Sequence, residues 1–189
     1  MIRTFVAIEM PAVVRDSIAT LQQDLRGFPV RVSWVRPANI HLTLKFLGDI
    51  WENQVGAISE ALARVGEKTA PFSLSLGTLG FFPNRRRPRV LWVGISNPNG
   101  ELRQLAESVE NALLPLGFKK EKRGFNPHLT FGRVRDPRNI EQVMEKLETT
   151  DFEEQAIFVK EMVFMKSTLH PQGSIYEPLK RIALGGNDS

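Results

Sequence analysis

Two short segments of this chain carry the side chains best suited to acid–base chemistry. His41 is followed by Leu, Thr and Leu, and His128 is followed by Leu, Thr and Phe. The chain has only three histidines and nine threonines in 189 residues, so a His-Leu-Thr pattern that occurs twice indicates a repeated function. Because imidazole titrates near neutral pH, each histidine could act as a general acid or a general base.

Each segment is typical of a β-strand with one polar face and one apolar face. Alternation sends residues i and i+2 of a strand to the same side. His41 should therefore share a face with Thr43, and His128 with Thr130, while the leucines and Phe131 point into the core. Two such faces across a cleft would supply an acid, a base and two hydroxyl donors. Metal-free transfer at a phosphodiester requires these groups.

The surroundings of the two segments repeat at the same spacing. Residues 92–95 follow residues 5–8 by 87 positions, and His128 follows His41 by 87 positions. A helix with an apolar stripe is expected after Pro11 and again after Pro98, and another follows each histidine segment. Such a long repeat predicts an α+β fold. We expect a bilobal pseudo-symmetric duplication of two antiparallel sheets, flanked by helices, with a central cleft.

The expected elements follow one another in the same order in both halves. We predict strands at 3–8, 30–35, 40–47, 72–76 and 92–95, a strand from 128, and strands at 158–167 and 174–184. Gly48 and Asp49 are expected to end the first histidine strand, and a basic strand or loop should precede the second. The order does not fix which strands pair. We expect a single domain over 1–189, with a repeat of roughly 1–86 and 87–189 and strands that could be exchanged between lobes.

The composition excludes several classes of protein. Hydrophobic residues make up 42% of the chain and charged residues 24%, which is ordinary for a globular domain. The absence of cysteine excludes disulfides, thiolate zinc sites and a cysteine nucleophile. The N-terminal apolar stretch is too short for a signal peptide, and no run is long enough to span a membrane. We therefore expect a cytoplasmic protein with no membrane association.

Basic residues are slightly in excess, with a net charge of +4 and a pI of about 9.6. They gather in two clusters, namely Arg85, Arg86, Arg87 and Arg89, then Lys119, Lys120, Lys122 and Arg123. Local positive charge attracts phosphate chains without specifying their sequence. The clusters favour an RNA substrate, although a charge run is also typical of a solvated loop.

The residues around both histidines resemble the two-histidine (2H) phosphoesterase superfamily. Its signature is a pair of His-x-Thr-x motifs on facing strands. The segments 34–48 (WVRPANIHLTLKFLG) and 125–133 (FNPHLTFGR) are similar to the LigT branch of RNA 2′,3′-cyclic phosphodiesterases, also called 2′-5′ RNA ligases. The likeness extends from residues 5–8 to the region of Tyr176 and Leu179.

The resemblance implies a cyclic phosphodiesterase, a phosphoric diester hydrolase that opens a terminal RNA 2′,3′-cyclic phosphate to a 2′-phosphomonoester. It implies that His41 is the proton donor to the leaving 3′ oxygen and His128 the base that activates water. Thr43 and Thr130 would bind the phosphate through hydrogen bonds, and Arg133 would bind its charge. From the residues alone the roles of the histidines are exchangeable, and only a bell-shaped pH profile follows.

Other interpretations of these residues stay open. A metal site would need three or four ligands, and neither histidine segment has an acidic neighbour on its polar face, so we expect no metal and no cofactor. A non-catalytic RNA- or nucleotide-binding module could use the same scaffold. Ligation of 2′-5′ linkages would be the reverse reaction at the same site. Phe46 and Tyr176 could stack on a base, but we expect both to pack in the core. His170 is expected to be a loop residue, and no protein partner is implied.

Overall fold

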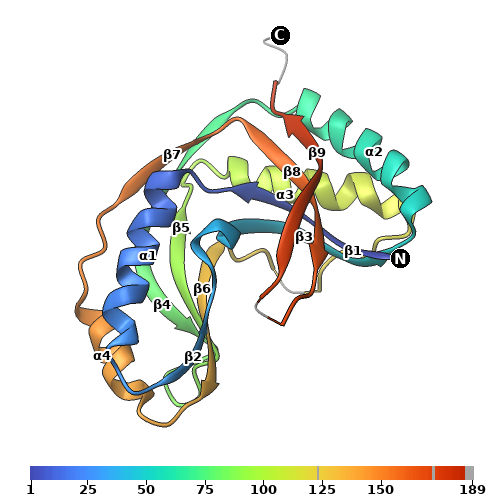
Figure 1. Cartoon of the computed structure of the whole chain (residues 1–189). Coiled ribbons are helices and arrows are strands. Elements are labelled where there is room, and N and C mark those ends of the chain that lie inside the picture. The colour runs from blue at the N-terminus through green and yellow to red at the C-terminus, as the bar shows by residue number, and fades with distance from the viewer. Residues whose placement is uncertain (123, 172, 186–189) are drawn as a thin grey trace.

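The computed structural model of the chain describes residues 1–122, 124–171 and 173–185. Its strands are β1 (Ile2–Glu9), β2 (Arg31–Trp34), β3 (His41–Ile50), β4 (Phe72–Phe82), β5 (Val90–Ser96), β6 (His128–Asp136), β7 (Gln155–Val159), β8 (Glu161–Thr168) and β9 (Ile175–Ala183). Its helices are α1 (Ala12–Arg26), α2 (Val55–Glu67), α3 (Glu101–Leu113) and α4 (Ile140–Thr149). The predicted α+β class with two antiparallel sheets flanked by helices is confirmed (Figure 1).

Each sheet combines strands from both halves of the sequence. One sheet, called sheet A here, has the order β3-β1-β8-β9, and the other, sheet B, has the order β2-β6-β5-β4-β7. All the pairings are antiparallel. Sheet A therefore takes β8 and β9 from the second half, while sheet B takes β2 and β4 from the first.

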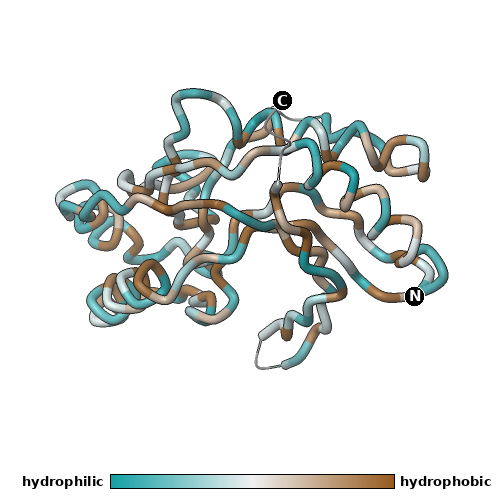
Figure 2. The backbone as a smooth tube through the Cα atoms, turned by 90° about the horizontal axis from the view of Figure 1, so that it is seen from above, coloured by the Kyte–Doolittle hydropathy of each residue, from teal (hydrophilic) through white to brown (hydrophobic). Residues whose placement is uncertain are grey.

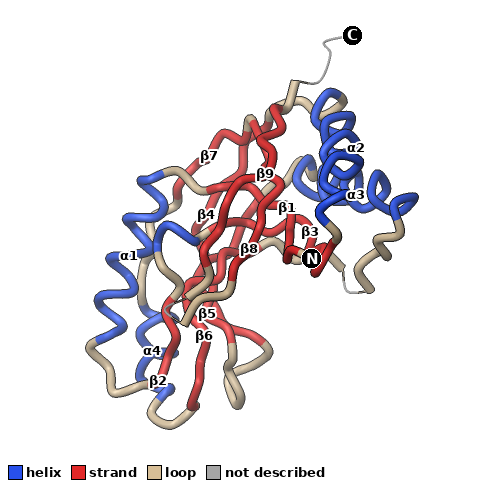
Figure 3. Tube along the Cα trace, turned by 45° about the vertical axis from the view of Figure 1, so that its right-hand side comes forward, coloured by secondary structure: helices blue, strands red, loops and turns tan. Residues whose placement is uncertain are grey.

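The helices are exchanged in the same way. Figure 3 shows α2 and α3 as one group of helices and α1 and α4 as another, with the strands between them. Helix α2 contacts α3 and β9, and α3 contacts β3, so this pair covers sheet A. Helix α4 contacts β4, and α1 bonds to the backbone of β6, so the other pair covers sheet B. Each sheet is thus covered by one helix from each half.

The helices form where an apolar stripe with helical spacing can be buried. In α1 the side chains of Val14, Ile18, Leu21 and Leu25 are at most 5% exposed. Pro11 precedes the first helical residue. Its φ of −64° suits the start of a helix, and no helical hydrogen bond is lost because a backbone N–H at this position would have no partner within the helix. Burial of such a stripe contributes about 1.5–3 kcal/mol to the free energy of folding for each fully buried aliphatic side chain, before the entropic cost of ordering the chain is subtracted.

Two groups of apolar side chains hold the molecule together. The larger core lies between the helices and the sheets and draws on both halves of the chain. A smaller cluster of Phe5, Ala7, Val163 and Met165, packed against Tyr176, lies on strands of sheet A. Figure 2 shows the hydrophobic segments mostly in the interior and the hydrophilic ones mostly on the outer turns. None of the helices described here has the length and apolarity needed to cross a membrane.

Two sequence-based expectations about the strands are wrong. The segment 158–167 is two strands in different sheets, because the chain leaves sheet B after β7 and enters sheet A at β8. Gly48 does not end β3. Glycine readily adopts the φ of +75° found here, which fits the register shift beside it, and pairing with β1 continues to Ile50. Of the two alternatives expected before the second histidine segment, the loop is the one found: residues 119–122 form no strand, and among the described residues of the second half β2 has no counterpart.

Candidate active site

The register of β6 places three polar side chains on one face of sheet B. His128, Thr130 and Arg133 pair with Gly94, Trp92 and Val90, which alternate along β5 and so share a face. Arg133 follows His128 by five positions, and regular alternation would put the two on opposite faces. A β-bulge between Thr130 and Gly132 adds one residue and restores Arg133 to the face of His128. Arg133 lies inside β6 rather than past its end.

Strand β3 is built in the same way. His41, Thr43 and Phe46 pair with alternate residues of β1, and a bulge at the position 87 residues before that of β6 again shifts the alternation. Phe46 is thus the structural counterpart of Arg133. Its side chain is 58% exposed, so the expectation that it packs in the core is wrong.

The two histidines are held by identical backbone hydrogen bonds. Nδ1 of His41 lies 2.7 Å from the carbonyl oxygen of Asn39, and Nδ1 of His128 lies 2.7 Å from that of Asn126. A carbonyl only accepts, so Nδ1 carries the hydrogen in both rings. Each Nε2 is then left to accept a proton when the ring is neutral or to donate one when it is charged. Both rings therefore have the tautomer in which Nε2 can transfer a proton.

Aromatic rings support each imidazole. Phe5 stacks on His41 with ring centroids 4.8 Å apart, and Tyr176 meets it edge-on at 5.2 Å. Phe82 meets His128 edge-on at 5.1 Å and itself packs against Trp92 at 4.9 Å. Tyr176 is partly buried against the small cluster of sheet A, so core packing describes it better than free exposure.

The indole of Trp92 also fixes a residue of the neighbouring strand. Trp92 pairs with Gly80 of β4, and a Cβ at Gly80 would lie 2.3 Å from its ring. Any larger residue at position 80 would therefore force the indole of Trp92 to move. The close contact between Trp92 and Gly80 helps to hold the indole against Phe82, which in turn contacts His128.

Charged residues from both sheets act on the pKa of His41. Burial lowers the pKa of His41 below its ordinary value of 6.5, the bond to the Asn39 carbonyl and the charge of Glu9 raise it, and the charge of Arg133 lowers it. Arg133 belongs to β6 and His41 to β3, and these two strands contact each other. The structure therefore brings His41 and Arg133 close enough for their charges to interact.

The two threonines are available to a ligand. Among the described residues, no hydrogen bond is made by the side-chain hydroxyl of Thr43 or of Thr130. Both side chains are partly exposed on the faces that carry the histidines. Each hydroxyl can therefore donate to a bound phosphate oxygen.

The arginines of the first basic cluster differ from one another in their partners. Arg85 pairs with Glu148 and with Glu141 of α4, so it is tied to the protein rather than directed to a ligand. Arg86, Arg87 and Arg89 remain exposed in the loop between β4 and β5. The loop is held by Asn84, whose side-chain oxygen accepts hydrogen bonds from the backbone amides of Arg86 and Arg87.

A buried ion pair holds the second basic cluster beside β3. Lys45 is 2% exposed, and its Nζ lies 2.6 Å from Oε2 of Glu110 in α3 and 2.9 Å from the carbonyl oxygen of Lys119. Arg123, the last residue of this cluster in the sequence, lies outside the described residues. In the described ranges, no three His, Asp or Glu side chains come together in a group that could hold a metal ion.

Several residues near the site were not selected from the sequence. Glu9 pairs with His41 across β1 and β3, and Phe5 and Phe82 line the two rings. The 87-residue register could have singled out Phe46 as the counterpart of Arg133. Nothing in the local sequence indicated Glu9, because its position depends on the register of β1 against β3.

Comparison with known proteins agrees with this duplicated arrangement. The family model of the LigT like Phosphoesterases matches the chain twice, at residues 8–92 and 93–176. The chain belongs to this family. The two matches begin 85 residues apart, which is close to the 87 residues between the two histidines of the LigT-like chain.

Relatives of known name cover almost the whole LigT-like chain. A protein of Methanothermobacter thermautotrophicus named RNA 2′,3′-cyclic phosphodiesterase is 34% identical over 95% of this chain and 97% of its own length. One of the same name from Aquifex aeolicus is 31% identical over 98% of both chains. Among solved structures, TT0787 of Thermus thermophilus superposes with a TM-score of 0.81 at 26% identity, covering 97% of this chain and 98% of its own. E. coli LigT complexed with 3′-AMP superposes with a TM-score of 0.76 at 28% identity and the same coverage.

Proposed function

We propose that this chain hydrolyses terminal 2′,3′-cyclic phosphates of RNA to 2′-phosphomonoesters by acid–base catalysis with two histidines and no metal. The observation that carries the proposal is the matched pair of imidazoles. Each is held through Nδ1 by the carbonyl two residues earlier, and each shares its face with a free threonine hydroxyl. The names of the relatives support RNA cyclic phosphate as the substrate.

In this mechanism water and the 3′ oxygen lie on opposite sides of phosphorus. Nε2 of neutral His128 takes a proton from water as the new P–O bond forms. The P–O3′ bond breaks, and Nε2–H of charged His41 gives its proton to O3′. The products are a 2′-phosphomonoester and a free 3′ hydroxyl, and the two histidines regain their starting states by exchange with solvent.

The remaining residues of the site stabilise charge. The hydroxyls of Thr43 and Thr130 donate hydrogen bonds to the non-bridging oxygens, and Arg133 balances the negative charge that develops on them. A bound phosphate also opposes the burial and the Arg133 charge that lower the pKa of His41, since an anion nearby favours the charged imidazole. Substrate binding itself would therefore help to load the acid with its proton.

The decisive experiment is an EDTA-treated assay on a short RNA that ends in a 2′,3′-cyclic phosphate. We expect the wild-type chain to open it to the 2′-phosphate, and His41→Ala and His128→Ala each to lower kcat by about 10²–10⁴-fold, the usual contribution of one positioned acid or base. Product analysis distinguishes the 2′- from the 3′-phosphate. Circular dichroism of both variants serves as the folding control.

The other outcomes are equally clear. RNA binding without turnover by the wild-type chain would replace this proposal with a non-catalytic binding module. Activity lost with EDTA and regained with a divalent metal would contradict the acid–base mechanism. If an RNA 5′ hydroxyl replaces water as the attacking group, the same site would make a 2′-5′ linkage, and a ligation assay with excess 5′-hydroxyl RNA tests this.

A further inference from the structure

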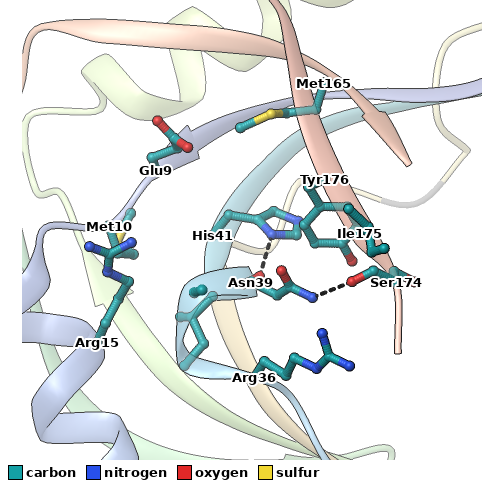
Figure 4. A pocket seen from close by; sticks show the side chains of 12 residues that line it. Glu9, Met10, Arg15, Arg36, Asn39, His41, Met165, Ser174, Ile175 and Tyr176 are labelled. Atoms are coloured by element: carbon teal, nitrogen blue, oxygen red, sulfur yellow. Dashed lines mark hydrogen bonds between the residues drawn. The ribbon is translucent and has the colours of Figure 1, made fainter. Parts of the chain in front are cut away.

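A pocket lies directly beside His41, and apart from His41 its lining residues have no role in the mechanism above. It has a volume of about 220 Å³ and is bounded by the start of α1, the segment before β3, and β9 (Figure 4). His41 forms part of its wall. It is smaller than the roughly 300–1,000 Å³ that hold a whole drug-sized ligand, so it suits one part of a longer molecule.

The walls of the pocket combine positive charge with apolar surface. Arg15 of α1 and Arg36, five residues before His41, both line it from different elements, as Figure 4 shows. Arg15 forms no ion pair with a carboxylate among the described residues. Met10 and Met165 supply apolar surface. A group that is anionic at one end and flat and apolar at the other would match these walls.

The negative charge in the pocket is already balanced. Glu9 also lines the pocket, but its Oε2 lies 2.6 Å from a guanidinium nitrogen of Arg181. Arg181, rather than Arg15, therefore neutralises this carboxylate. The charge of Arg15 can then act on a ligand, and a phosphodiester is an anion that a guanidinium binds with two parallel hydrogen bonds.

The direction of the reaction indicates which part of the substrate reaches the pocket. If His41 protonates O3′, the ribose of the terminal nucleotide lies on the His41 side of phosphorus and the water lies on the other side. The chain that leads away from this ribose then begins beside the pocket. The nucleotide preceding the cyclic end is thus the nearest group with a phosphodiester and a base.

We propose that this pocket is a subsite for the nucleotide immediately 5′ of the cyclic end, with Arg15 binding its phosphodiester. The inference rests on the proposed function and narrows it. The substrate class becomes oligoribonucleotides with a cyclic end, in preference to 2′,3′-cyclic mononucleotides, because a mononucleotide leaves the subsite empty.

The test compares substrates that share the same cyclic terminus. These are a 2′,3′-cyclic mononucleotide, a dinucleotide ending in it, and the same dinucleotide with an uncharged methylphosphonate between its nucleosides. We expect the wild-type kcat/KM to be at least about tenfold higher for the natural dinucleotide than for the mononucleotide. The methylphosphonate should lose most of this preference, since it keeps the sugar and base and removes the charge.

Variants connect the preference to the pocket. Arg15→Gln should lower kcat/KM for the natural dinucleotide about tenfold and change that for the mononucleotide less than about twofold. Arg64→Gln removes the same charge from the exposed surface of α2 and should leave both values unchanged.

Each contrary result has a distinct meaning. A wild-type chain without preference for the dinucleotide, or with the same preference for the methylphosphonate, would overturn the phosphate subsite. An equal loss on mononucleotide and dinucleotide in the Arg15→Gln variant would overturn it too. A wild-type chain inactive on every substrate would instead refute the proposed function on which the subsite depends.

Discussion

At the scale of single residues, the environment of His41 is set by opposing charges. Burial and Arg133 lower its pKa, while the Asn39 carbonyl and Glu9 raise it. Glu9 belongs to β1 and faces His41 across the strand pair, so it acts on the imidazole without a place in the proposed chemistry. This makes Glu9 a means of changing the titration of one histidine alone.

We predict that Glu9→Gln lowers kcat/KM at pH 8 about threefold on a cyclic mononucleotide, because it lowers the pKa of the proposed acid His41. Losing the carboxylate removes a charge that raises the pKa of His41, so the pKa falls further below 6.5. Above that pKa the protonated fraction of His41 falls in proportion, and a general acid must be protonated. Steady-state kcat/KM between pH 5.5 and 8.5 reports this titration of the free enzyme.

The same variant distinguishes acid from base. If His41 were the base, it would already be neutral at pH 8, and a lower pKa would leave kcat/KM there unchanged. Glu161→Gln is the matched control, because Glu161 shares Arg181 with Glu9 at 2.8 Å but is not among the groups that shift the pKa of His41. An equal fall in both variants would attribute the effect to the ion-pair network.

At the scale of elements, a buried ion pair joins β3 to α3 and to the segment before His128. Lys45 and Glu110 are only 2% and 15% exposed, so each needs the other in the folded state. We predict that Lys45→Met lowers the free energy of unfolding by about 3 kcal/mol, because it leaves Glu110 as a poorly solvated, unpaired charge. Urea unfolding followed by circular dichroism measures the change.

A second ion pair offers the control. Lys166 and Glu177 lie 3.4 Å apart on β8 and β9 but are 35% and 56% exposed, so Lys166→Met should cost less than about 1 kcal/mol. Adding Glu110→Gln to Lys45→Met should restore part of the lost stability, since it removes the unpaired charge. A Lys45 variant as stable as the Lys166 variant would show that the buried pair has no structural weight.

How far the sequence predicts an element depends on what determines that element. The helices were predictable because each buries one stripe, as Ile140, Val143 and Leu147 do in α4. The His-x-Thr faces were predictable for the same local reason. The bulges were not, because they appear only when one strand is paired with another, and without them Arg133 and Phe46 are assigned to the wrong face. The split near Lys160 escaped prediction because both resulting strands are apolar and β-prone.

At the scale of the whole molecule, the exchange of strands and helices makes the halves interdependent. Residues 1–86 contain β1 and β3 but neither β8 nor β9, which complete sheet A, nor α3, which covers it. Residues 87–189 contain β5 and β6 but lack β2 and β4, their neighbours in sheet B. The small cluster of Phe5 and Ala7 with Val163 and Met165 joins the two ends of the chain directly. The histidines are thus placed by contacts that neither half can make alone.

We propose that residues 1–189 fold as one bilobal domain, and we predict a single cooperative thermal transition. Calorimetric and van't Hoff enthalpies of the full chain should agree, as expected for a two-state domain. Fragments 1–86 and 87–189 should each lack a cooperative transition, because both leave strand edges unpaired and apolar faces uncovered. Refolding the two fragments together should recover the transition and the cyclic phosphodiesterase activity. Two resolved transitions in the full chain, or a fragment that unfolds cooperatively alone, would mean that the lobes are separate domains and that the active site forms by docking.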